Sequence, residues 1–102
     1  MYDIDAELLE YGYKFEFDYG EYGYDWTETR VYTKSNRVFA LSDSGCSCNY
    51  FGEWFSEVNE AIGSMVEVIS LPPLVGYTSD SSSHDFTDKD SLREAFRALG
   101  VR

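Results

Sequence analysis

The sequence has little of several residue types that common protein chemistry requires. In 102 residues it contains two cysteines, one histidine, two prolines and eight basic residues. A structural zinc site needs four ligands, typically Cys and His, and this chain alone does not supply them. The sequence also lacks the G-x-S-x-G elbow of many hydrolases, the phosphate-binding P-loop and the dinucleotide-binding G-x-G-x-x-G. These absences argue against such hydrolases, against nucleotide-binding enzymes and against single-chain zinc proteins.

Positive charge is scarce compared with negative charge. Nineteen acidic residues against eight basic ones give a net charge of −11. Such a protein repels nucleic-acid phosphates and anionic membranes, so we expect no direct binding to nucleic acid or membrane. No apolar run reaches the roughly 18 residues of a spanning helix, and the acidic first residues do not resemble a signal peptide. The sequence therefore predicts a cytoplasmic protein, whose acids either keep it soluble or attract a basic protein surface.

Aromatic residues, by contrast, are abundant: nine Tyr, seven Phe and two Trp make up 18% of the chain. Disordered chains are poor in aromatic residues, so we expect a folded protein. A length of 102 residues fits one domain with a core of modest size. We therefore predict a single compact domain over residues 1–102.

The first half of the chain has the pattern of a short helix followed by strands. Apolar residues within 3–11 have helical spacing, and Gly12 follows them. Alternating aromatic and charged residues predict a strand at 13–19, and the β-branched and aromatic residues of 24–34 predict a second. A third strand is expected at 38–43, and short turns join the three. In the first strand the alternation places the aromatic residues on one face and the charged residues on the other. Three such strands make an antiparallel β-meander.

The second half has helical patterns. Apolar residues from Trp54 to Met65 form a helical stripe that Gly63 ends or loosens, while residues 65–70 fit either a strand or a continued helix. Residues 76–91 form a polar loop before a last amphipathic helix. The predicted fold class is α+β: a meander of three to four strands, covered on one face by two to three helices.

The last helix carries its own boundary signals. Thr87 or Asp88 is the expected N-cap, because a short polar side chain there can accept a hydrogen bond from the first turn. Gly100 is the expected stop.

Cys46 and Cys48 stand two apart in the string G-C-S-C. Our first interpretation is structural: Gly45 supplies a positive φ at the end of the third strand, and the two free cysteines pack there as small apolar residues. Two alternatives remain open. One is a metal site completed by His84, a carboxylate or a second chain. The other is a disulfide between the two cysteines, whose tight ring would make it labile.

The segment E-Y-G-Y-D-W is the most suggestive candidate for a binding surface. Tyr22, Tyr24 and Trp26 lie around a predicted turn together with Glu21 and Asp25. Tyr and Trp are favoured anchors of protein contacts when a loop presents them. The alternative is that these aromatic side chains cover a thin edge of the core.

Two further patterns carry no catalytic prediction. The loop S-D-S-S-S-H-D-F places His84 near Ser and Asp, but a nucleophilic triad needs a rigid scaffold. The acidic residues are scattered over strand and helix positions, where a solvated face is the expected explanation. We therefore expect no catalytic residues and no cofactor.

Residues 11–58 resemble a family of small uncharacterised proteins encoded by bacteriophages of actinobacteria. The shared features are an aromatic, Gly-containing strand region, the G-C-S-C turn and the following aromatic segment F-G-E-W. The segment L-P-P-L and the polar loop at 76–91 have no place in this resemblance. It implies a phage origin and the host cytoplasm, and it supplies no catalytic residues.

These observations favour a small, acidic, non-enzymatic phage accessory protein that binds a host or phage protein. One alternative is a nucleic-acid mimic, whose carboxylates occupy the basic cleft of a host enzyme or defence system. The other is a metal- or thiol-dependent protein centred on Cys46 and Cys48.

Overall fold

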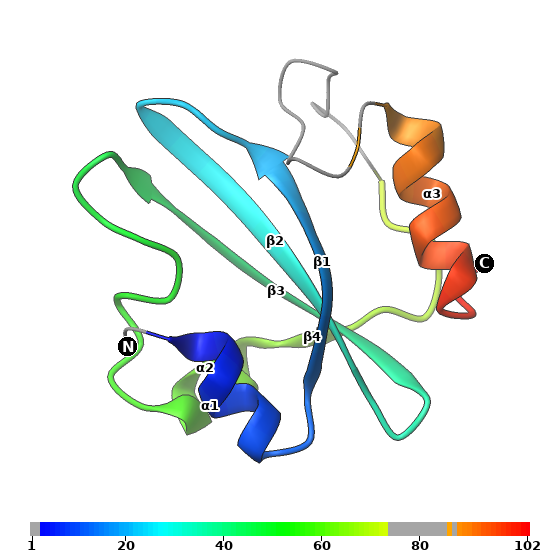
Figure 1. The fold of residues 1–102 in the computed structure, drawn as a ribbon, viewed down its shortest axis with the longest axis horizontal. Helices are drawn as coiled ribbons and strands as arrows, with labels where there is room; N and C mark the ends of the chain where they lie inside the picture. Colours follow the sequence, from blue (N-terminus) through cyan, green and yellow to red (C-terminus); the bar gives the residue numbers. More distant parts are fainter. Residues whose placement is uncertain (1–2, 74–85, 87) are drawn as a thin grey trace.

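The computed structural model describes residues 3–73, 86 and 88–102. The elements in chain order are α1 (Ile4–Glu10), β1 (Lys14–Glu21), β2 (Asp25–Lys34), β3 (Arg37–Cys46), α2 (Val58–Ser64), β4 (Val66–Glu67) and α3 (Lys89–Ala98) (Figure 1). The strands form one antiparallel sheet of four strands in sequence order. The predicted α+β fold, a meander with three helices, is confirmed.

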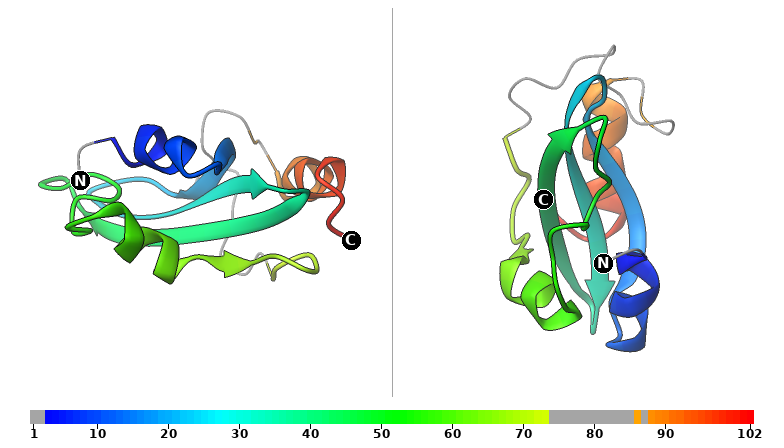
Figure 2. Two further views of the ribbon diagram at one scale, coloured as in Figure 1. Left: turned by 90° about the horizontal axis from the view of Figure 1, so that it is seen from below. Right: turned by 90° about the vertical axis from the view of Figure 1, so that its left-hand side faces the viewer.

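Helices cover both faces of the sheet, so the expectation of one covered face is wrong. Val31 and Tyr32 are consecutive in β2, and both are fully buried. Because consecutive strand residues point to opposite faces, each face must have its own core. Val31 belongs to a cluster with residues of α3, whereas Tyr32 belongs to a cluster with residues of α1 and α2. Figure 2 shows α1 and α2 near one end of the molecule and α3 near the other.

A β-bulge in β1 divides its aromatic residues between the two faces of the sheet. Phe15 pairs with Tyr32 and Phe17 pairs with Val31, because the register shifts between Phe15 and Phe17. An extra residue in a strand turns the side chains that follow it to the other face. The single aromatic face expected for this strand is therefore not present. The ring of Phe17 instead packs against Phe96 of α3, with 5.1 Å between centroids.

The turn between β2 and β3 is the two-residue turn that a twisted hairpin favours. Ser35 and Asn36 have positive φ angles of 53° and 62°. Positive φ at both central residues is the mark of a type I′ turn, which matches the twist of the strands. The third strand is longer than predicted, because β3 continues past residue 43 to Cys46.

Helix α2 is shorter than the apolar stripe predicted. It begins at Val58, after Glu57 in an extended conformation, and Trp54 lies before it with 71% of its surface exposed. The Glu60 carboxylate accepts hydrogen bonds from the backbone N–H of Ser56, at 2.7 Å, and from its hydroxyl, which fixes the start of the helix. Gly63 lies inside α2.

The open question of residues 65–70 is decided in favour of a strand. Val66 and Glu67 form β4, which pairs with Ala40 and Phe39 of β3. The backbone N–H of Val68 extends this pairing by donating to the Val38 carbonyl at 2.8 Å.

Helix α3 has the predicted boundaries. The Asp88 carboxylate caps it by accepting a hydrogen bond from the Ser91 N–H at 2.7 Å, and Gly100 follows with a φ of 92°. The helix begins at Lys89, so the last residues of the predicted loop at 76–91 are helical. His84 and most of that loop lie outside the described residues.

Candidate functional site

The sheet brings the two segments singled out in the sequence to one end of the molecule. Asp25 pairs with Cys46 and Trp26 with Gly45 across β2 and β3. The turn between β1 and β2 therefore lies beside the G-C-S-C turn, at the upper left of Figure 1. We call residues 20–28 and 43–53 the acidic end, for the charge described below.

At the tip of the β1–β2 hairpin Tyr24 faces solvent, whereas Tyr22 and Trp26 each make a side-chain hydrogen bond. Tyr24 has 77% of its surface exposed. The Tyr22 hydroxyl donates a hydrogen bond to the Asp18 carboxylate at 3.0 Å. Burial, together with the carboxylates of Glu28 and Asp18, raises the pKa of Tyr22, so that its phenol remains a hydrogen-bond donor. Tyr24 is thus presented on a hairpin whose base is fixed.

Trp26 faces inward from the same hairpin. Its indole N–H donates to the Cys46 carbonyl at 2.8 Å, and its ring lies 6.5 Å from that of Phe51. Trp26 therefore joins the hairpin to the G-C-S-C turn. The two acids predicted beside it, Glu21 and Asp25, are exposed.

A disulfide joins Cys46 and Cys48, so the prediction of two free cysteines is wrong. The two Cα atoms are 5.3 Å apart, within the range that a disulfide spans. The disulfide was one of the alternatives left open by the sequence. By the chain-entropy relation, closing a loop with a single residue between the cysteines stabilises the fold by less than about 2 kcal/mol. Cys48 is exposed and Cys46 is half-buried.

Gly45 does not have the predicted positive φ, because it is a strand residue of β3. It is needed there for a different reason. A Cβ at this position would overlap the side chain of Asn49. That side chain uses the space to accept a hydrogen bond from the Cys46 N–H at 2.8 Å, while the Asn49 N–H donates to the Cys46 carbonyl at 3.2 Å. Among the described residues, the Asn49 Nδ2 atom is buried and has no partner.

Behind the hairpin lies a half-buried charged cluster on the face of the sheet that α1 covers. The Arg30 guanidinium donates to Asp5 of α1 at 2.9 Å and to Glu28, and it lies 4.2 Å from the centre of the Phe51 ring. The Tyr32 hydroxyl donates to Asp5 at 2.6 Å. Arg30 thus links α1, β2 and the segment that follows the disulfide.

The acids of this cluster are not all solvated, contrary to the expectation from sequence. Glu28 has 9% of its surface exposed. Burial raises the pKa of Glu28, and a hydrogen bond from Arg30 opposes that shift. For Arg30 itself burial lowers the pKa, but the hydrogen bond and charge of Glu28 outweigh it and raise the pKa overall. These groups satisfy one another, which is the arrangement expected of a structural network.

Charge is segregated along the sheet. Neither residues 15–29 nor residues 38–88 contain a lysine or an arginine. Both segments of the acidic end lie within these ranges. Lys34 and Arg37 flank the β2–β3 turn, which lies at the lower right of Figure 1. The electrostatic potential at the end that carries Tyr24 and the disulfide therefore favours positive charge.

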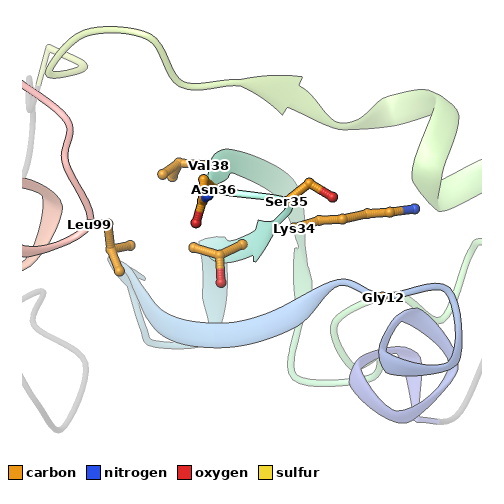
Figure 3. A pocket seen from close by; sticks show the side chains of 7 residues that line it. Gly12, Lys34, Ser35, Asn36, Val38 and Leu99 are labelled. Atoms are coloured by element: carbon orange, nitrogen blue, oxygen red, sulfur yellow. The ribbon is translucent and has the colours of Figure 1, made fainter.

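A hollow of about 380 Å³ lies at the other end, lined by the β2–β3 turn, Gly12 and Leu99 (Figure 3). Lys34 contributes its stem, but its ammonium group lies 4.6 Å from the centre of the Tyr13 ring. None of the site residues predicted from sequence lines this hollow. In the described part of the chain, no three His, Cys, Asp or Glu side chains are placed to hold a metal ion.

Sequence reasoning missed Asn49 and the cluster around Arg30. The alternation of β2 held a signal for the cluster, because Glu28 and Arg30 share a strand face with the aromatic residues Trp26 and Tyr32. Charged residues on an apolar strand face indicate a buried ion pair. Asn49 had no such signal. It follows the strand, and its side chain binds the backbone of Cys46 beside Gly45.

Two further findings bear on what kind of protein this is. In the described ranges no helix has the length and apolar character needed to cross a membrane. Comparisons of the chain with protein-family models, with curated proteins and with solved structures find no match.

Proposed function

We propose that this chain is a small, non-enzymatic phage accessory protein that acts by binding a host or phage protein in the host cytoplasm. The observation that carries the proposal is Tyr24, which is 77% exposed on a hairpin tip within a segment free of positive charge. The resemblance of residues 11–58 to actinobacteriophage proteins supports the phage origin. The partner's contact surface is expected to be basic.

The physical argument rests on contact area and charge together. An exposed tyrosine offers a large, stiff, amphipathic surface, and such side chains dominate many protein interfaces. A guanidinium group of the partner can stack on the Tyr24 ring while its charge meets Glu21 or Asp25. The bonds of Tyr22 and Trp26 hold the hairpin in place, so that little ordering is required on binding.

The test is capture of a partner from host lysate, its identification by mass spectrometry and measurement of its affinity. Tyr24→Ala should weaken binding at least tenfold, as expected for the loss of a central aromatic anchor. The double change Glu21→Lys with Asp25→Lys should also weaken it. Its matched control is Glu7→Lys with Glu10→Lys, which alters the net charge equally on exposed positions of α1.

Equal loss in both double variants would show that only total charge matters, and an unaffected Tyr24→Ala variant would remove the hairpin from the interface. Competition of DNA for the captured partner, with affinity falling steeply as salt rises, would indicate nucleic-acid mimicry instead.

A further inference from the structure

We propose that Cys46–Cys48 is a thiol–disulfide exchange site, at which a thiolate of a partner attacks the sulfur of Cys48, an exposed residue, and the Cys46 sulfur leaves. This activity goes beyond the binding proposed above and does not require Tyr24 to contact a partner, although it takes the cytoplasmic location from that proposal. It requires a disulfide that an outside thiol can reach, two sulfurs with different roles, and a fold that survives opening of the bond.

The surroundings of the two cysteines are unequal. Cys46 ends β3, and its backbone is held by Trp26 and Asn49, the nearest bonds being 2.8 Å long. Cys48 lies past the end of the strand and is exposed. An incoming thiolate therefore reaches Cys48 first. Cys46 stays in place after the bond opens, because its backbone bonds do not involve its sulfur.

The disulfide contributes little to the stability of the fold. It encloses a single residue, so it lowers the entropy of the unfolded chain only slightly and stabilises the fold little. The cores on both faces of the sheet consist of other residues. In a reducing cytoplasm, disulfides that do form are usually transient and serve catalysis or redox sensing.

The reaction is a two-electron exchange with a dithiol. The first thiolate of the partner bonds to the Cys48 sulfur, the Cys46–Cys48 bond breaks, and its electron pair leaves on Cys46, which takes up a proton. The second thiolate of the partner then attacks the partner's own sulfur in the mixed disulfide, and Cys48 leaves and is protonated. The partner becomes a disulfide and the turn a dithiol. A low-molecular-weight disulfide restores the turn by the reverse steps.

Charge selects the class of thiol. Asp25 pairs with Cys46, and the carboxylate of Asp43 accepts hydrogen bonds from the backbone N–H groups of Ser44 and Gly52, at 2.8 and 2.9 Å. The acidic end contains no basic residue. Anionic thiols such as glutathione are therefore repelled, and a protein dithiol on a basic surface is attracted.

The first experiment measures reduction of the oxidised full chain by three small thiols at equal thiolate concentration, with acid quenching and mass spectrometry. Cationic cysteamine should react about tenfold faster than glutathione, with neutral mercaptoethanol between them, and the order should fade in about 1 M salt. A disulfide that persists while cystine is reduced under the same conditions would overturn the proposal. Equal rates for all three thiols would overturn the charge selection.

The second experiment assigns the two sulfurs. Cystamine should form a mixed disulfide at Cys48 in Cys46→Ser about tenfold faster than at Cys46 in the matched variant Cys48→Ser. A faster reaction at Cys46 would overturn the assignment. If either variant fails to fold, limited alkylation of the reduced wild-type chain gives the same answer, because Cys48 should be modified first.

Discussion

The two ends of the sheet are built by different means. At the β2–β3 end, two residues with positive φ reverse the chain and the strands pair up to Lys34 and Arg37. At the acidic end, the β1–β2 hairpin and the G-C-S-C turn are held by contacts between distant residues: Trp26 with Cys46, and Arg30 with Asp5 and Phe51. One end is specified by local backbone geometry, and the other by tertiary contacts.

This difference indicates which end of the sheet can carry binding residues without changing the fold. A two-residue turn leaves few side chains free to vary without changing the register of the strands. The acidic end is fixed from behind by the Arg30 cluster, so that Tyr24 and Cys48 are exposed on a rigid base. Binding residues are commonly found on loops that a rigid scaffold positions.

The largest effect is expected from Arg30→Ala. Its loss leaves Glu28 and Asp5 without their common positive partner, and an uncompensated buried charge costs about 3 kcal/mol of unfolding free energy. Urea denaturation measures it. The matched control is Arg37→Ala at the other end, where the Arg37–Glu67 pair is exposed and little change is expected. Equal losses for the two variants would contradict the contrast between the ends.

Gly45→Ala should have the next largest effect. The added methyl group overlaps the Asn49 side chain, which must move and give up its bond to the Cys46 N–H. Overpacking of this kind costs about 1–3 kcal/mol. Thermal or urea unfolding would measure the loss, and reversal of much of it by the added change Asn49→Ala would identify the overlap as its cause.

The pH dependence of Glu28 gives a third test. Burial raises the pKa of Glu28, so the folded state binds this proton more tightly than the unfolded state does. The stability that follows is fully present below the unfolded pKa of about 4.3 and is lost as pH rises through the folded pKa. Glu28→Gln should match wild type at low pH and exceed it in stability near neutral pH. Urea titrations across this range would measure the difference, and a constant difference at all pH values would contradict the assignment.

The smallest effect is expected at the β2–β3 turn. Ser35 has a φ of 53°, a conformation that costs an ordinary residue about 1–2 kcal/mol and glycine almost nothing. Glycine gives back about 0.5–1 kcal/mol through the greater entropy of the unfolded chain. Ser35→Gly should therefore stabilise the protein by about 0.5 kcal/mol in urea denaturation. A destabilised variant would show that the Ser35 side chain has a role beyond the backbone turn.

Much of the fold could be read from sequence because its signals are local. The β-branched and aromatic residues of β2, the cap at Asp88 and the stop at Gly100 are each signals carried by a few neighbouring residues. The aromatic face of β1 was predicted wrongly because a single bulged residue reverses the alternation, and nothing in the sequence marks it. The start of α2 was predicted too early, because Trp54 and Phe55 have the apolar spacing of the helix although the helical backbone begins only at Val58.

For the candidate site, the residue types were visible but their relations were not. The sequence by itself determined the acidic charge, the presence of tyrosine and tryptophan around a predicted turn, and the spacing of the two cysteines. Only the tertiary structure decided that Cys46 meets Trp26 and that Arg30 joins α1 to the sheet, because these contacts link residues 20 and 25 positions apart. Periodicity reports which face of a strand a residue occupies, whereas strand register and chain packing decide what it meets there.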